Sequence, residues 1–323
     1  MDIQNLWSLQ CMMFLLVAAG VVLKRKGILK EEGKTILTDA VLYFFLPCNI
    51  INSFRMEFDP SILQKFAVVL GISLLVQAVS YVLSKCLYNQ KPLAVKRVMQ
   101  YCTIVSNSGF LGLPIAAGIY GAEGMMYASI FIIPMRVMMW SAGIACFTES
   151  PDMKSVIKKV AVHPCIIAVY IGLGLLLFQA PLAAGYESLT GMGGVLGSVA
   201  AVLVTALDKA VTSAGGCTTA LTMVLIGMMM AEVEPSGMLD KDAWFMTALR
   251  LVILPGLVFF GCRLAGVDSF LTGICVLITG MPAGSTSAIL AAKYGCEYTL
   301  ATKCIVVSTL LSMLSIPLWA MAL

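Results

Sequence analysis

Long apolar runs, separated by short stretches that carry charge or glycine, cover most of this 323-residue chain. Each run has the roughly 20 residues that an α-helix needs to cross the hydrocarbon core of a bilayer. Because an unpaired backbone amide is too costly in lipid, we expect every run to be helical. The ten runs lie near residues 6–23, 36–54, 62–84, 97–119, 125–147, 160–179, 211–231, 243–264, 268–292 and 298–322.

The stretch between the sixth and seventh runs departs from this pattern. Residues 181–208 are rich in glycine and end in a shorter apolar run, so a loop, a re-entrant segment or an extra helix would each fit. Lysine and arginine help to choose, because they gather in cytoplasmic loops. With ten crossings the inner side collects most of these residues, Arg250 among them, whereas an extra crossing would invert the second half. We therefore expect an irregular connection at 181–208 and both termini outside.

Composition supports a membrane protein and argues against several other classes. The chain is 60% hydrophobic and 12% charged, whereas a soluble domain carries about 25% charged residues. No basic stripe interleaved with aromatic residues appears, so we expect no binding to nucleic acid. The 11 cysteines are scattered and His163 is the single histidine, so we expect no metal and no cofactor. Lys24–Lys26 follow the first apolar run, so we expect that run to be a retained span.

Two segments of the chain read alike and indicate an internal repeat. Residues 120–123 are Tyr-Gly-Ala-Glu and follow the fourth run, and residues 294–297 are Tyr-Gly-Cys-Glu and follow the ninth. Superposing them, at an offset of 174 residues, also superposes the preceding runs and an interruption inside each run. Five runs separate the two copies, and an odd number of crossings inverts the second copy relative to the first. The sequence thus predicts an inverted repeat.

The two interruptions point to a functional site. They contain Gly109, Gly112 and Pro114 in the fourth run, and Gly280, Pro282 and Gly284 in the ninth. A proline removes an amide donor and opens backbone groups at membrane depth, where they are tolerated only inside protein or beside a wet cavity. Paired broken helices are typical of carriers, and the N-termini of their second halves attract anions. The alternative is that these prolines and glycines only kink two membrane helices.

The interrupted fourth run, residues 107–114 (Asn-Ser-Gly-Phe-Leu-Gly-Leu-Pro), resembles the fourth-span motif of the auxin efflux carrier family, the bacterial relatives of plant PIN proteins. Residues 282–294 and 308–319 are similar to the C-terminal half of that family, and residues 20–27 and Leu46-Pro47 to its start. The resemblance therefore covers nearly the whole chain. Two features depart from it: His163-Pro164 stands where the family more usually has Asn-Pro, and the insertion near 182–208 is long.

This resemblance implies an all-α, NhaA/PIN-like elevator fold, with about ten transmembrane helices in two inverted five-helix repeats and with broken helices 4 and 9 that cross. Residues 1–60 and 151–240 would form a scaffold, and residues 61–150 and 241–323 a moving transport domain. The family transports organic anions such as small carboxylates, and its scaffold is often a homodimer. The implied partners are thus a small organic anion, the lipid bilayer of the cell membrane and a second copy of the chain.

Five polar residues are candidates for substrate binding. Asn107, with Ser108 beside it, could donate to a carboxylate, although a purely structural helix cap is the alternative. Ser285 and Ser287 follow the second break and could donate from there, or bond locally within their helix. Arg136 lies in the middle of a run, where a cation needs a partner. That partner would be an anionic substrate or an acid, for which Glu123 and Asp39 are the candidates.

Other functions remain open at this point. A cation-coupled symporter or antiporter, driven by Na⁺ or H⁺, would need buried carboxylates, and no deep pair is apparent. A membrane sensor that keeps a carrier fold is a further alternative. An intramembrane hydrolase using Ser285 and His163 would need the two side chains within hydrogen-bond reach, and we expect His163 near the cytoplasmic edge. We therefore predict a transporter of organic anions and not an enzyme.

Overall fold

The computed structural model describes residues 3–55, 57–147, 153–191, 194–231 and 240–323. Helices account for nearly all of this part of the chain, which contains no β-strand beyond one isolated bridge. In the N-terminal half they are α1 (Ile3–Arg25), α2 (Glu31–Ala40), η1 (Val41–Phe45), α3 (Leu46–Ser53), α4 (Ser61–Leu87), α5 (Leu93–Ile104), η2 (Ser108–Gly112), α6 (Leu113–Met138) and η3 (Met139–Gly143). An all-helical chain is what the apolar runs predict.

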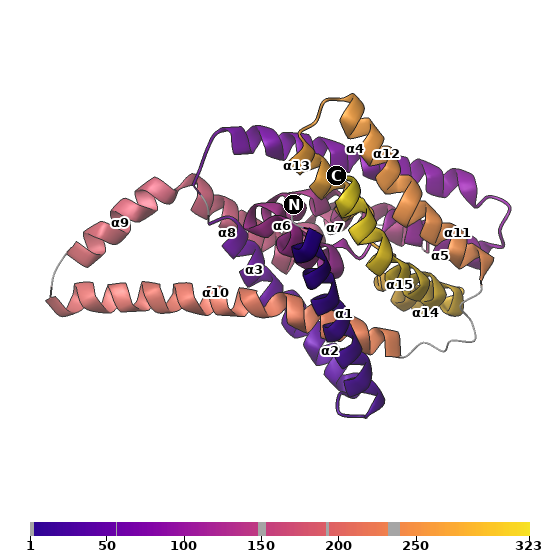
Figure 1. Ribbon diagram of the computed structural model, residues 1–323, viewed down its shortest axis with the longest axis horizontal. Helices are drawn as coiled ribbons and strands as arrows, with labels where there is room; N and C mark the ends of the chain where they lie inside the picture. The colour runs from indigo at the N-terminus through magenta and orange to yellow at the C-terminus, as the bar shows by residue number, and fades with distance from the viewer. Residues whose placement is uncertain (1–2, 56, 148–152, 192–193, 232–239) are drawn as a thin grey trace.

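The second half continues in the same way (Figure 1). Its helices are α7 (Met153–Ala161), α8 (Pro164–Leu177), α9 (Gln179–Gly191), α10 (Gly194–Ala231), α11 (Lys241–Ala248), η5 (Leu249–Ile253), α12 (Leu254–Leu264), α13 (Ser269–Thr279), α14 (Thr286–Lys293) and α15 (Tyr298–Ala322). Within the described residues, six helices are long and apolar enough to cross a membrane, or seven if the bent pair α8 and α9 forms one span. The expected count of ten crossings stays a prediction.

The expectation of an irregular connection at 181–208 is wrong. Residues 179–191 form α9, and α10 begins at Gly194 and runs for 38 residues, well before the predicted start of the seventh run. α8 and α9 meet at an angle of 75°. α9 and the first turns of α10 extend away from the other helices (Figure 1), and many of their apolar side chains are exposed. Gly191, Gly194 and Gly197, which suggested a loop, therefore lie in helices, and residues 192–193 fall outside the described residues. Apolar neighbours such as Val202 and Leu203 favour a helix in lipid.

Three π-helical turns end immediately before a Leu-Pro pair. The turns η1, η2 and η5 precede Leu46-Pro47, Leu113-Pro114 and Leu254-Pro255, respectively. Proline has no amide hydrogen and its ring crowds the preceding turn, which favours a locally wider helix. Two of these turns, η2 and η5, carry residues that meet at the broken helices described below.

Glycines let α1 and α10 approach closely. A Cβ atom on Gly20 would lie 2.1 Å from the Val224 carbonyl oxygen, and one on Gly227 would lie 2.0 Å from the Val17 carbonyl oxygen. Contacts between small residues are a common way for membrane helices to pack, because lipid gives apolar side chains little reason to associate. α10 also packs on α3, and α3 on α8, so these helices form one group.

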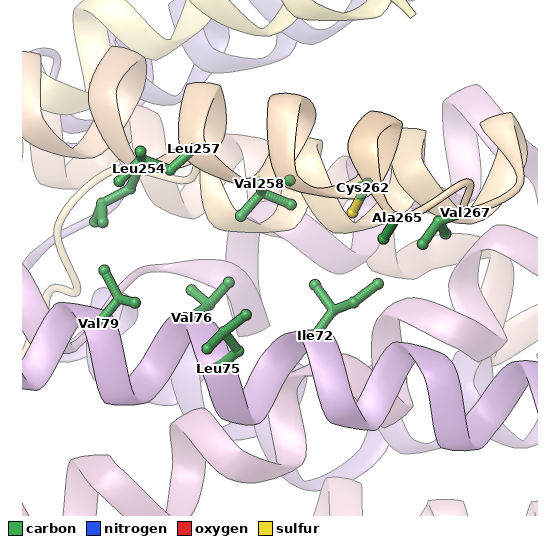
Figure 2. Close-up of a pocket in the computed structure, with 11 residues that line it drawn as sticks. Ile72, Leu75, Val76, Val79, Leu254, Leu257, Val258, Cys262, Ala265 and Val267 are labelled. Carbon is green, nitrogen blue, oxygen red and sulfur yellow. The ribbon is translucent and has the colours of Figure 1, made fainter.

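A second group contains α4–α6 and α11–α15, where α4 packs on α6 and α13 contacts both α6 and α12. An open groove of about 280 Å³ lies between α4 and α12. Figure 2 shows side chains of the two helices, among them Ile72, Val76 and Val258, facing each other across it. The side chains that line this groove are aliphatic apart from one glycine and the Cys262 thiol. The groove therefore has no group that recognises a charged ligand.

Candidate functional site

Two helices of the second group are broken at the predicted interruptions. α5 ends at Ile104, and the chain runs through an extended residue, Val105, before η2 and α6 begin. α13 ends at Thr279, and α14 begins at Thr286. Each break therefore leaves a C-terminal end and an N-terminal end of a helix inside the protein.

The two breaks lie against each other in an antiparallel arrangement. The Asn107 N–H donates to the Pro282 carbonyl (2.8 Å), and the Gly284 N–H donates to the Val105 carbonyl (3.1 Å). Ser106 and Ala283 form the isolated bridge between them. The breaks thus satisfy one another's backbone groups, which an apolar environment requires.

The predicted glycines and prolines fit this close approach. A Cβ on Gly284 would lie 3.2 Å from Val105 Cγ1, and one on Gly112 would lie 3.1 Å from Ile278 Cδ1. Pro114 is buried at the start of α6, and Gly280 follows the last residue of α13. Pro282 is buried, and its carbonyl accepts from the opposite break.

The C-terminal ends of the first half-helices meet at Arg250. Its Nη1 donates to the Thr103 carbonyl (2.7 Å), its Nε to Met281 (3.0 Å) and its Nη2 to Thr279 (3.5 Å). A cation is favourable there, because unpaired carbonyls and the helix dipole make a C-terminus negative. The assignment of lysine and arginine residues to loops on the inner side included Arg250, and for this residue it is wrong. Arg250 is 4% exposed and joins the two breaks.

The N-terminal ends of the second half-helices face a separate cavity of about 130 Å³. Three of the five predicted binding residues line it: Asn107, Arg136 and Ser285. Leu42, Leu46 and His163 line it from the first helix group, so the cavity lies where the two groups of helices meet. One water needs about 10–15 Å³ of such space, so the cavity has room for a small molecule.

Arg136 is the charged group of this cavity. It is 5% exposed, its Nη1 lies 2.9 Å from His163 Nε2, and its Nε has no hydrogen-bond partner. Neither predicted acid pairs with it: Glu123 lies 3.8 Å from Lys65 instead, and Asp39 is exposed. Among the described residues, no carboxylate comes within ion-pair distance of Arg136. The cavity therefore contains a buried cation to which the described residues supply no counter-charge.

The polar side chains beside Arg136 also have free hydrogen-bonding capacity. Asn107 is 7% exposed and is the N-cap residue of η2, but its carboxamide makes no capping bond there. The Ser285 side chain likewise makes no cap hydrogen bond at the start of α14. The purely structural cap considered for Asn107 is thus absent.

The other two predicted residues lie outside the cavity. The Ser108 hydroxyl faces the opposite side of the crossing and donates to the Ile278 carbonyl (3.2 Å). The Ser287 hydroxyl is fully buried and donates to the Gly284 carbonyl (2.8 Å), the local bonding considered as its alternative. Adjacent or alternate helix positions point in different directions, so residues next to a binding position need not face the ligand.

His163 was expected near the cytoplasmic edge, and its depth in the bilayer stays a prediction. It was not among the predicted binding residues, however, and the structure places it at the cavity. It precedes α8 and lines the same cavity as Arg136 and Ser285. No hydrogen bond joins His163 to Ser285 in the part of the chain that the structure describes. One feature of the sequence could have indicated this position. His163-Pro164 opens a span at the place where the related family more usually has Asn-Pro.

Apolar helices that meet at a pair of breaks beside a buried cation define a multi-pass membrane protein of the transporter class. The chain belongs to the membrane transport protein family, whose model matches residues 10–320. This match confirms the resemblance to the auxin efflux carriers.

Two archaeal relatives match nearly the whole chain. One is an uncharacterized transporter of Methanothermobacter thermautotrophicus, 26% identical over 317 residues, or 95% of each chain. The other is the uncharacterized transporter MJ1031 of Methanocaldococcus jannaschii, 24% identical over 316 residues, or 94% of each chain. The family and the two relatives agree on membrane transport, and their names specify no substrate.

Proposed function

We propose that this protein transports a small organic anion and binds the carboxylate of that anion in the cavity at the crossing. The observation that carries the proposal is Arg136, a buried guanidinium that lines the cavity and has no carboxylate beside it among the described residues. Holding a cation at membrane depth costs about 2.5–3.5 kcal/mol even by lenient scales. An anionic substrate would offset that cost each time it binds.

The backbone around the cavity supports the same choice of ligand. η2 with α6, and α14, begin beside it, and helix N-termini carry unpaired amides and a partial positive charge. Anions bind readily at such ends. In this proposal Arg136 supplies the counter-charge, whereas the Asn107 carboxamide and the Ser285 hydroxyl donate hydrogen bonds. Ser108 and Ser287 have no part in binding.

Alternating access would follow from the two helix groups. We propose that α4–α6 with α11–α15 move as an elevator against α1–α3 with α8–α10. The cavity between the groups, with Leu42 and Leu46 on one side and Asn107 on the other, supports this division. The scaffold group would form a homodimer in the cell membrane.

The inverted repeat with ten crossings is part of this proposal. In its support, the matching segments 120–123 and 294–297 each contain a glycine with positive φ, 67° at Gly121 and 62° at Gly295. Met13 of α1 and Ala320 of α15 share one apolar cluster, so the first and last described helices pack together.

A thermal-shift screen of the purified protein tests the function. We expect stabilisation by one or more carboxylates from a panel of monocarboxylates, dicarboxylates, aromatic acids and bile acids. Arg136→Ala and Asn107→Ala should each lose this response and uptake, yet remain folded and monodisperse. Ser285→Ala should weaken it, whereas Ser287→Ala, the matched serine outside the cavity, should keep it. Stabilisation by Na⁺ and by no anion would overturn the proposal and favour a cation carrier.

A further inference from the structure

We propose that His163 is a second substrate-binding residue, which donates its Nε2–H to the carboxylate held by Arg136. This inference rests on the proposed function and adds the recognition element that pairs with the arginine.

The Nδ1 side of His163 is occupied by the start of α8. His163 is the N-cap residue, and its Nδ1 accepts from the Cys165 N–H (3.2 Å). Pro164 has no amide hydrogen, so the Cys165 amide is the first one that a cap can reach. An N-cap acceptor of this kind stabilises a helix start, because the first amides have no partner within the helix.

The Nε2 side faces another donor. Arg136 Nη1 lies 2.9 Å from His163 Nε2, and a guanidinium nitrogen can only donate. A neutral imidazole, however, has one donor nitrogen and one acceptor nitrogen. If Nδ1 accepts from Cys165, Nε2 carries the hydrogen and points it at Arg136. If Nε2 accepts from Arg136, the hydrogen on Nδ1 points at the Cys165 amide instead. In every protonation state at least one contact joins two donors.

An acceptor that reaches both Arg136 and His163 from the cavity resolves this conflict. A carboxylate only accepts, and its two oxygens can take one hydrogen each from Nη1 and from Nε2–H. The Arg136 Nε–H is buried and has no partner, so the guanidinium has a further donor to offer. Both residues line the cavity of about 130 Å³, so a ligand there reaches them together. The geometry favours an anion with two acceptor oxygens over a neutral or cationic ligand.

Two substitutions separate this role from helix capping. His163→Ser keeps an N-cap oxygen but cannot reach the ligand, so we expect at least about tenfold weaker binding in a protein that folds normally. His163→Asp also keeps the cap and places a carboxylate beside Arg136, so the anion response should disappear. His163→Asn keeps both a cap oxygen and an N–H donor and should bind better than His163→Ser. The probes are malonate, succinate and benzoate, with binding measured by thermal shift and calorimetry on the full chain.

The chain's single histidine allows a direct spectroscopic test. Tag-free protein labelled with ¹⁵N-histidine gives signals from one imidazole. On saturation with a carboxylate that binds, we expect Nε2 to be protonated and Nδ1 to be the unprotonated acceptor. Unprotonated Nε2 in the bound state, or wild-type affinity in both His163→Ser and His163→Asp, would overturn the inference while leaving the proposed function standing. A wild-type protein that binds none of the carboxylate panel would overturn both.

Discussion

Two arginines lie at opposite ends of the crossing with almost equal exposure, 5% for Arg136 and 4% for Arg250. Arg250 donates from all three kinds of guanidinium nitrogen to carbonyls at the ends of α5 and α13, and the cavity beside it is about 10 Å³. Arg136 contacts His163, whose Nε2 is itself a donor in one tautomer, has a buried Nε without a hydrogen-bond partner, and lines a cavity of about 130 Å³. The same side chain at the same burial thus has two different environments.

This difference teaches how to distinguish a structural cation from a binding one. Arg250 lies where the half-helices end and their carbonyls need a cation. Arg136 lies where the second half-helices begin, and nearby backbone amides add to the positive potential rather than neutralise it. A fully bonded cation holds the crossing together, whereas an incompletely bonded one beside open space is available for a ligand.

Arg250→Leu should have the largest effect. It leaves three buried carbonyls without a partner at the centre of the crossing, and we expect a loss of at least about 3 kcal/mol in stability. The measurement is yield and thermal unfolding in detergent by fluorescence-detected size-exclusion. A monodisperse Arg250→Leu protein with wild-type unfolding temperature would show that Arg250 does not hold the two breaks.

Arg136→Leu should remove binding but leave the fold intact. The substitution removes a buried charge that has no counter-ion among the described residues, so the free energy of unfolding should change by less than about 1 kcal/mol or increase. Carboxylate binding should fall below detection. The same two assays used on both arginine variants provide the contrast, and equal destabilisation by the two substitutions would contradict it.

Gly284→Val should separate the two breaks that Arg250 connects. The added side chain would start 3.2 Å from Val105 Cγ1 and 3.4 Å from the Ser106 carbonyl oxygen, and such overpacking costs about 1–3 kcal/mol. Transport should fall with stability. Gly174→Val in α8 is a matched control, because a Cβ there meets nothing within 4 Å. Equal effects of the two glycine substitutions would argue against a tight crossing.

The ion pair between Asp240 and Lys303, at the edge of the second helix group, should give the smallest effect, with which the other effects can be compared. Partial desolvation raises the pKa of the Asp240 carboxyl, but the amides of Ala243 and Asp242 and the Lys303 ammonium lower it, and the net pKa lies below its ordinary 3.8. The resulting stabilisation is present above that ordinary pKa and is lost as the pH falls through the lower folded value.

Asp240→Asn keeps a cap for α11 and removes this charge, so it should cost less than about 1 kcal/mol at neutral pH. The difference from wild type should shrink and then vanish as the pH falls below the ordinary carboxyl pKa of 3.8. Thermal unfolding across that range measures it. A larger cost, or one that is independent of pH, would show that Asp240 acts through something other than its charge.

The sequence predicted the parts of the molecule that follow from local chemistry. The breaks were predictable because proline and glycine interrupt the apolar runs. In the structure the two breaks lie against each other, and the backbone amides of Asn107 and Gly284 each donate a hydrogen bond to the opposite break. The functional role of Arg136 could be proposed from the sequence because a cation in the middle of an apolar run needs a partner. The helix at 194–208 was not, because glycine content alone does not decide between loop and helix in lipid.

The parts that failed depend on tertiary placement. Arg250 lies near the start of an apolar run, where the sequence gives the same signal for a loop cation and for a buried one. The inward position of His163 depends on where α8 packs, and the directions of Ser108 and Ser287 depend on helix phase after a π-helical turn and after a break. None of these is a property of the neighbouring residues alone.

Uptake into proteoliposomes tests the central claim most directly. Wild-type protein and Arg136→Leu, reconstituted at equal density, would be given the carboxylate that stabilises the wild type most. The account predicts saturable uptake by the wild type and none above empty vesicles by Arg136→Leu. Equal uptake by the two proteins would contradict the claim that this buried guanidinium binds the transported anion.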